Sequence, residues 1–261
     1  MYEQCISSAN PGLLLILIDQ SDTMSEIYGD ETKAEFAART ANKLINATIV
    51  SCMSGEYVRN RWYVAVIGYG ENATVLFLNK LSELAQNTNI VTTKRKISDG
   101  AGGFVEVEEN MWVFVTPMSK GKIPMSAAIE EAYIGAKLFV EHYTDSCPPV
   151  VVNITDGKSI DSLFDSAVKK IKTLETTDGN LLLANVLISD SIKETYEFPN
   201  SEFSLWGNKL AELSSQAPDS YLGEIEYLGY DVKVDSKLFL CNSDNVELFI
   251  QMYHNSIGRF R

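Results

Sequence analysis

The sequence predicts an α/β fold: a doubly wound, mostly parallel, Rossmann-like sheet with one antiparallel edge strand and helices on both faces. Two observations lead to this fold class. Short aliphatic runs, of which residues 13–18 (LLLILI) are the first, have the length and composition of strands buried on both faces of a parallel sheet. Segments with a helical spacing of apolar residues separate these runs, and strands that alternate with helices form parallel sheets with right-handed crossovers.

The first third of the chain predicts one crossover unit and one hairpin. Residues 13–18 form the first strand, and the apolar spacing over 33–52 predicts the first covering helix. Residues 61–69 (RWYVAVIGY) and 73–78 (ATVLFL) have strand patterns, and the residues between them, 70–72, are turn formers. We therefore expect the antiparallel edge of the sheet at this hairpin.

The rest of the chain continues the alternation after one interruption. Residues 79–110 have no strong period and contain the Gly-rich stretch ISDGAGGFVEVEEN, so we expect an insertion there, and we hypothesise that it contributes to a partner surface. The elements expected after it are a strand at 111–115, a helix opened by Pro124 over 125–142, a strand ending in Asp156, a helix at 159–174, a strand at 181–189, helices at 205–214 and 245–254, and one more short strand within 227–240.

Composition limits the classes of function. The chain has 261 residues and no composition break, so we expect a single domain over 1–261. Its 22 Lys and Arg residues against 35 Asp and Glu residues give a net charge of −13, so we expect neither nucleic acid nor an anionic membrane as a partner. No basic stretch precedes the first apolar run, and the four cysteines are scattered, so we expect a cytoplasmic protein with reduced thiols.

Polar side chains follow two of the aliphatic strands. Asp19, Ser21 and Thr23 place one carboxylate and two hydroxyls on alternate residues of one loop, and Asp156 ends a second strand. Because open α/β sheets bind ligands at the carboxyl ends of their strands, these four side chains converge if the two strands are neighbours. Mg²⁺ prefers oxygen ligands and keeps several waters, which makes the four residues candidate metal ligands. The alternative is that Ser21 and Thr23 cap a helix and that the acids are ordinary loop residues.

Three motifs, in this order, resemble those of the von Willebrand factor A domain. LLLILIDQSDTMSE (13–26) is similar to the first motif of the family, an apolar strand followed by DxSxS. WVFVTPMSKGKIPMSAAIEEA (112–132) resembles the middle motif, and VVVNITDG (150–157) resembles the third. The resemblance covers most of the chain and is strongest to bacterial cytoplasmic members.

The resemblance implies a metal-ion-dependent adhesion site. In such a site a divalent cation, Mg²⁺ with Mn²⁺ or Ca²⁺ able to substitute, is completed by an acidic side chain of a partner protein. Asp19, Ser21 and Thr23 match the first motif residue by residue, and Asp156 matches the third.

The sequence departs from the pattern of the family at three positions. Asp22 replaces the usual Gly between the two hydroxyls, Thr23 replaces the second Ser, and Ile123 stands where the family carries its Thr ligand. The isoleucine side chain offers no oxygen to a cation. Ser126, Thr116 or a water molecule are the alternatives for this ligand. A degenerate, metal-free site is the alternative for the whole constellation.

Two functions from different classes follow. The first is a non-enzymatic interaction module that docks an acidic residue of a protein partner through the cation, or by metal-free surface contact if the site is degenerate. The resemblance implies a kinase, a phosphatase or an ATPase of the same system as that partner. The second is a phosphotransfer enzyme of the haloacid dehalogenase type with Asp19 as nucleophile, but that superfamily expects an acid at the position of Ser21. We therefore expect an interaction module and not an enzyme.

Overall fold

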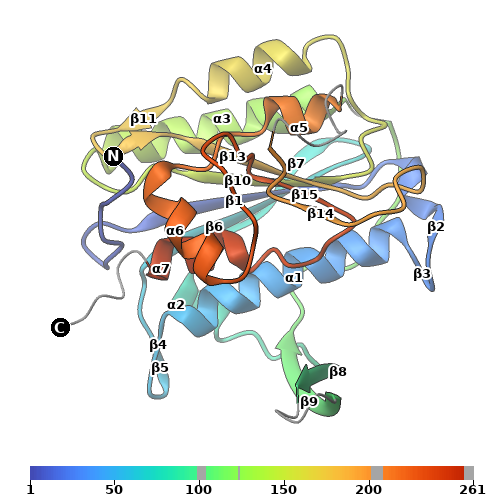
Figure 1. Ribbon diagram of the computed structural model, residues 1–261, viewed down its shortest axis with the longest axis horizontal. Helices are drawn as coiled ribbons and strands as arrows, with labels where there is room; N and C mark the ends of the chain where they lie inside the picture. Colours follow the sequence, from blue (N-terminus) through green and yellow to red (C-terminus); the bar gives the residue numbers. More distant parts are fainter. Residues whose placement is uncertain (99–103, 123, 201–207, 256–261) are drawn as a thin grey trace.

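In the computed structural model, which describes residues 1–98, 104–122, 124–200 and 208–255, the chain folds around a seven-stranded sheet (Figure 1). The strand order is β14-β15-β13-β10-β1-β6-β7. Strand β1 pairs in parallel with β6 and β10, and β13 pairs in parallel with β10 and β15. The doubly wound, mostly parallel sheet predicted from the sequence is therefore confirmed.

Both edges of the sheet are antiparallel. The strands are β1 (Gly12–Asp19), β6 (Trp62–Tyr69), β7 (Ala73–Lys80), β10 (Val150–Thr155), β13 (Leu182–Leu187), β14 (Tyr196–Glu197) and β15 (Phe239–Cys241). The predicted hairpin corresponds to β6 and β7, so β7 is the expected antiparallel edge strand. At the other edge, β14 pairs antiparallel with β15; its two residues are too few to give a strand pattern in the sequence.

Helices connect and cover the strands. They are α1 (Lys33–Ser51), α2 (Leu81–Leu84), α3 (Met125–His142), α4 (Phe164–Ile171), α5 (Lys209–Leu213), α6 (Asp219–Tyr227) and α7 (Leu248–Asn255), with the 3-10 helix η1 (Asp22–Ser25). The predicted helices at 33–52 and 125–142 correspond closely to α1 and α3, whereas α4 is shorter than the helix predicted at 159–174. The sequence did not predict α6.

Alternating side chains of β1 enter two separate cores. Every residue of this strand is buried. Leu14 and Ile16 pack in the core covered by α1, α6 and α7, whereas Leu13 and Leu15 pack in the core covered by α3, α4 and α5. Figure 1 shows α3 and α4 on one side of the sheet and α1 on the other. Burial on both faces explains why the strand is a continuous aliphatic run.

The segment 79–110, expected as an insertion, contains regular structure. After the end of β7 and α2 it includes β8 (Ile90–Ser98) and most of β9 (Phe104–Trp112), which pair with each other in an antiparallel hairpin. This hairpin, called the arm below, projects from the body beyond α1 (Figure 1). It is a two-stranded sheet of its own, so its sequence lacks the apolar face by which the strands of the central sheet are recognised. Of the strand predicted at 111–115, only residues 111 and 112 lie in a strand, at the end of β9.

Two asparagines of α1 fix the base of the arm. The Asn46 amide donates to the Trp112 carbonyl at 2.8 Å, and its oxygen accepts from the Trp112 N–H at 3.0 Å. The Asn42 oxygen accepts from the N–H groups of Phe114 and Val115, at 2.8 and 3.0 Å, and its amide donates to the Val115 carbonyl at 2.8 Å. These side chains replace the backbone partners that a neighbouring strand would supply.

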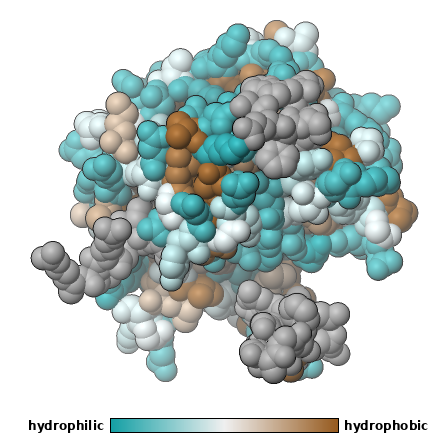
Figure 2. All heavy atoms as spheres, in the orientation of Figure 1, coloured by the Kyte–Doolittle hydropathy of each residue, from teal (hydrophilic) through white to brown (hydrophobic). Residues whose placement is uncertain are grey.

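In the described residues, three short hairpins, each of two two-residue strands, lie outside the central sheet and the arm. The hairpins are β2 (Ile27–Tyr28) with β3 (Glu31–Thr32), β4 (Met53–Ser54) with β5 (Tyr57–Val58), and β11 (Glu175–Thr176) with β12 (Gly179–Asn180). The face shown in Figure 2 is mostly hydrophilic, with small apolar areas between polar ones. Within the described ranges, no helix is both long enough and apolar enough to traverse a bilayer.

Candidate functional site

The predicted site lies where the order of the strands reverses. From β1 the chain first adds β6 on one side and later adds β10 on the other, with α1 and α3 on opposite faces. The carboxyl ends of β1 and β10 are therefore neighbours, and the loops after them flank the crevice in which open α/β sheets bind ligands. Asp19 ends β1 and Asp156 directly follows β10, so the condition for convergence, that the two strands are neighbours, is met.

Asp19 is fully buried and satisfied by hydrogen bonds. Its Oδ1 accepts from the Ser21 N–H at 2.9 Å, and its Oδ2 accepts from the Thr155 hydroxyl at 2.7 Å and from the Ser159 hydroxyl at 3.1 Å. Burial raises the pKa of Asp19, and the bonds from Ser21 and Thr155 oppose that shift only in part. The charged form of this carboxylate is thus held at an energetic cost.

Three hydroxyls gather beside the Asp19 carboxylate. The Ser21 and Thr23 hydroxyl oxygens are 3.1 Å apart, and the Ser159 hydroxyl lies 3.3 Å from that of Ser21. The structure therefore brings together three of the four predicted ligands, Asp19, Ser21 and Thr23. Sequence reasoning missed Thr155 and Ser159, although both belong to the run TDGKS around the predicted Asp156.

The Asp156 carboxylate, the fourth predicted ligand, faces lysines. Its Oδ1 accepts from the Lys158 N–H at 3.0 Å. Its Oδ2 lies 3.5 Å from the Lys33 ammonium and 3.8 Å from that of Lys158. The side chain is fully buried, so these contacts supply the opposite charge that a buried carboxylate needs.

Lys33 is the centre of this ion cluster. Only 1% of the residue is exposed, and its ammonium lies 2.6 Å from Glu26 and 2.8 Å from Asp190 in addition to Asp156. Burial alone would lower the pKa of Lys33, but the hydrogen bonds to Asp190 and Glu26 and the charge of Asp156 outweigh it and raise that pKa. The lysine is therefore a permanent positive charge next to the carboxyl edge of the sheet.

The departure at Asp22 has a structural role. Its carboxylate accepts from the Gly121 N–H at 2.7 Å, and its own N–H donates to the Gly121 carbonyl at 2.9 Å. The Lys120 N–H donates to the Gln20 carbonyl at 2.6 Å. The segment 116–122 of the middle motif is thereby fastened to the loop that follows β1.

Thr116 lies within the segment 116–122, whereas Ile123, at the family's Thr position, and Ser126 lie after it. Ile123 lies outside the described residues. Thr116 is exposed, and Ser126 is buried at the start of α3, where its N–H donates to Asp161 at 3.1 Å. Neither residue is hydrogen-bonded to Asp19 in the part of the chain that the structure describes.

The hydroxyl cluster fits a hard divalent cation in its chemistry and spacing. Adjacent ligands of an octahedral Mg²⁺ with arms of about 2.1 Å are about 3.0 Å apart, close to the Ser21–Thr23 separation. Asp19 and the ion cluster of Glu26, Asp156, Asp190, Lys33 and Lys158 together hold four carboxylates against two ammonium groups, an excess of negative charge that a divalent cation would balance. Within the described residues, no group of three or more His, Cys, Asp or Glu side chains could hold a metal ion.

A series of hydrogen-bonded, buried polar side chains connects the strands next to the site. The Tyr69 hydroxyl donates to Asn153 at 3.0 Å, the Asn153 amide donates to Asn185 at 2.9 Å, and the Asn185 amide donates to the Ser214 hydroxyl at 2.9 Å. These residues come from β6, β10, β13 and the end of α5. Such a satisfied network fixes the relative positions of the strands whose ends form the site.

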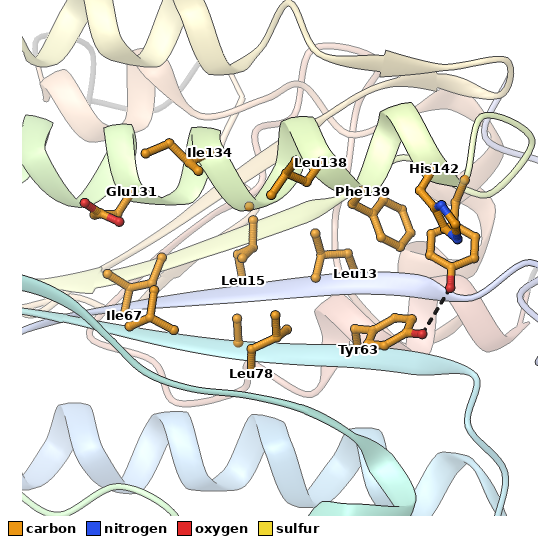
Figure 3. Close-up of a pocket in the computed structure, with 14 residues that line it drawn as sticks. Leu13, Leu15, Tyr63, Ile67, Leu78, Glu131, Ile134, Leu138, Phe139 and His142 are labelled. Carbon is orange, nitrogen blue, oxygen red and sulfur yellow. Dashed lines mark hydrogen bonds between the residues drawn. The ribbon is translucent and has the colours of Figure 1, made fainter.

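An apolar groove lies away from the predicted residues. A groove of about 470 Å³ runs between α3 and the β7 edge of the sheet, and Figure 3 shows Leu13 and Leu15 of β1 at its floor. Leu78 of β7 and Leu138 of α3 are 58% and 64% exposed on its rim. The groove lies at the edge of the sheet, because β7 is the last strand on this side. The sequence did not reveal it, since its apolar residues also fit the pattern of a core.

The comparisons with known proteins support the fold. No protein-family model matches the chain, and no curated protein matches it. Among solved structures, the pilus adhesin SpaC from Lactobacillus rhamnosus GG is similar with a TM-score of 0.52 at 12% identity, over 96% of this chain and 31% of SpaC. Manganese-loaded TRAP from Plasmodium vivax gives 0.44 at 15% identity, over 94% of this chain and 74% of TRAP.

A third similar structure is VWA2, an ArnB paralog from Sulfolobus acidocaldarius, with a TM-score of 0.36 at 13% identity over 69% of this chain and 35% of VWA2. Of these three likenesses, that to SpaC has a TM-score above 0.5, and at 12% identity it shows the fold alone. The mostly parallel seven-stranded sheet, its antiparallel edge strands β7 and β14 and its covering helices are consistent with the Rossmann-like fold of von Willebrand factor A domains.

Proposed function

We propose that this chain is a non-enzymatic protein-interaction module, which docks an acidic side chain of a partner at the carboxyl edge of its sheet through a divalent cation. Asp19, Ser21 and Thr23 would hold the cation, Mg²⁺ with Mn²⁺ or Ca²⁺ able to substitute, and Asp156 is the fourth ligand that the sequence predicts. Metal-free contact by the same loops is the form this function takes if the cation is not bound.

One observation carries the proposal: a buried carboxylate and three hydroxyls converge at the topological switch point of the sheet. Burial raises the pKa of Asp19, so a cation beside it would relieve the cost of its charge. The bound cation would also present positive charge on a chain of net charge −13, which otherwise repels acidic partners. A kinase, phosphatase or ATPase of the same system remains the proposed class of partner.

The haloacid dehalogenase alternative has less support. Asp19 would be the nucleophile, and both of its oxygens accept hydrogen bonds from neighbouring groups. The position two residues later, where that mechanism needs an acid, is Ser21, and its hydroxyl contacts those of Thr23 and Ser159. Hydrolysis of an aryl phosphate that disappears in Asp19→Asn would revive this alternative.

The first experiment measures the cation itself. Chelator-treated protein is titrated with Mg²⁺ and with Mn²⁺ by calorimetry, and Asp19→Ala is titrated beside it. Binding that is lost in Asp19→Ala supports the proposal. Absence of binding to the wild-type chain contradicts the cation-dependent form and leaves the metal-free form to be tested by the second experiment.

The second experiment measures the docking of an acidic group. Acetate is the simplest probe of a partner's carboxylate, and the backbone amides of Ser21, Gly157 and Lys158 report on the site by NMR. Acetate shifts that require Mg²⁺ support docking through the cation, and shifts of equal size in chelator support metal-free contact. Shifts in neither condition contradict docking of a carboxylate at this edge.

A further inference from the structure

In this chain the middle motif lacks the Thr oxygen that the resembled family uses as a metal ligand. Ile123 stands at the Thr position and its hydrocarbon side chain cannot bind a cation. A hard cation prefers oxygen ligands, so another oxygen of the chain or of water must take that place.

Ser159 offers such an oxygen at the cluster. Its hydroxyl lies 3.1 Å from Asp19 Oδ2 and 3.3 Å from the Ser21 hydroxyl, so it stands beside two of the predicted ligands. Its own carbonyl accepts from the Met125 N–H at 2.9 Å, which fixes its backbone against the start of α3. Ser159 therefore approaches the cluster from the loop after β10, opposite the loop that carries Ser21.

Asp156, in contrast, is already neutralised. Its Oδ1 accepts from the Lys158 N–H at 3.0 Å, and its Oδ2 faces the Lys33 ammonium at 3.5 Å. Lys33 is itself 1% exposed and cannot turn to water without giving up its contacts to Glu26, Asp156 and Asp190. The Asp156 carboxylate is thus paired with a lysine ammonium of the protein itself.

We propose, on the basis of the cation site put forward above, that Ser159 is a direct ligand of the divalent cation in this chain and that Asp156 is the counter-ion of Lys33 rather than a ligand. The ligand set is then Asp19, Ser21, Thr23 and Ser159, one carboxylate and three hydroxyls. Such a set carries a single negative charge, so it binds Mn²⁺ and Mg²⁺ weakly and leaves the cation strongly positive toward a partner's carboxylate.

The test compares Mn²⁺ affinity in four variants by calorimetry and by the electron paramagnetic resonance signal of free Mn²⁺. Ser159→Ala is expected to weaken binding by about tenfold or more, and Asp156→Asn by less than about threefold. Asp156→Asn keeps the Oδ1 acceptor of the Lys158 N–H, and Lys33 keeps Glu26 and Asp190. Ser166→Ala, which removes a hydroxyl on the exposed side of α4, is the matched control and is expected to bind as the wild type does. Asp19→Ala defines complete loss.

The outcomes separate the two proposals. Wild-type binding that is lost in Asp19→Ala but unchanged in Ser159→Ala overturns the role of Ser159 and leaves the cation site standing. Loss in Asp156→Asn as large as in Asp19→Ala also overturns it. Wild-type protein that binds no Mn²⁺ contradicts the cation site and the role of Ser159 together. Far-ultraviolet circular dichroism verifies folding, and Ser159→Gly removes the same hydroxyl if the alanine variant unfolds.

Discussion

Asp22 and Gly121 hold each other through two hydrogen bonds, one from the Gly121 N–H to the Asp22 carboxylate and one from the Asp22 N–H to the Gly121 carbonyl. They are 99 residues apart in sequence, and together they fasten the segment 116–122 beside the hydroxyl cluster. Asp22, which stands where the resembled family has Gly, therefore has a structural role in this chain. The Asp22–Gly121 pair is called the clasp below.

Breaking the clasp should loosen the segment and destabilise the fold modestly. Asp22→Ala removes a charged acceptor at an exposed position and should lower the free energy of unfolding by about 1 kcal/mol. Gly121→Ala should cost about 2 kcal/mol or more, because its φ is +97° and an added Cβ would lie 2.4 Å from the Gly70 carbonyl oxygen. Urea unfolding measures both, with Asp30→Ala as an exposed-acid control. An Asp22→Ala variant as stable as the control contradicts the clasp.

Asp19→Asn should stabilise the protein in chelator and abolish the proposed cation binding. Burial raises the pKa of Asp19, so its charged form costs free energy at neutral pH, and a neutral amide of the same shape avoids that cost. We therefore expect a higher free energy of unfolding without metal. Thermal unfolding with and without Mg²⁺ measures it beside Asp30→Asn. A loss of stability in chelator would show that the carboxylate is needed structurally.

The Glu26 contacts should make stability fall in acid. Hydrogen bonds from Lys158 and Lys33 lower the pKa of Glu26 to about 2, against about 4.3 in an unfolded chain. A lowered carboxyl pKa stabilises the folded state above the unfolded value, and that contribution is lost as the pH falls from about 4.3 toward about 2. Urea unfolding between about pH 6 and about pH 3 should show a shallower decline in Glu26→Gln than in wild type. Glu56→Gln, an exposed control, should follow the wild-type slope.

Asn42 should determine how well the backbone amides at the base of the arm are protected from hydrogen exchange. Asn42→Ala removes the acceptor of the Phe114 and Val115 N–H groups and the donor to the Val115 carbonyl. Hydrogen exchange at these two amides should accelerate, and the free energy of unfolding should fall by about 2 kcal/mol, because the freed groups are partly buried. Asn79→Ala, which removes only an exposed contact to Glu83, should change neither quantity. Unchanged exchange at Phe114 would refute the anchoring role.

Gly135→Ala should stabilise α3. Gly135 lies in the interior of the helix, and an added Cβ would meet only Leu15 Cδ2, at 3.9 Å, an ordinary contact. Alanine restricts the unfolded chain and favours the helix, so the free energy of unfolding should rise by about 0.5 to 1 kcal/mol. Chemical denaturation measures the gain, and Gly223→Ala in α6, where nothing lies within 4 Å, should behave alike. A loss at Gly135 alone would indicate that the groove beside it closes around this residue.

The sequence predicted the elements whose patterns follow from burial. The run 13–18 became a strand with alternate side chains in two cores, and α1 and α3 followed the spacing of their apolar residues. It did not predict α6, whose centre holds Gly223, a weak helix former. The insertion at 79–110 was expected, but its hairpin was not, because a hairpin outside the sheet needs no apolar face.

The sequence predicted those residues of the candidate site that come at or directly after the end of a strand. Asp19, Ser21 and Thr23 converge because they share one loop, which spacing reveals. Lys33 gave no sign of its role, since a lysine at a helix start is usually solvated and its burial depends on Asp156 and Asp190, far along the chain. Ser159 likewise meets Asp19 only through the pairing of β1 with β10.

The pairing of β1 with β10 also sets when the site comes into being during synthesis. Asp19 and its donor Thr155 are 136 residues apart, so a nascent chain exposes the acid of the first strand long before the hydroxyl that bonds to it emerges from the ribosome. Closing so large a loop is slow compared with forming α1 or the β6–β7 hairpin. A fragment that ends before β10 therefore carries the whole first motif without Thr155 and Ser159, whose hydroxyls donate to Asp19 in the complete fold.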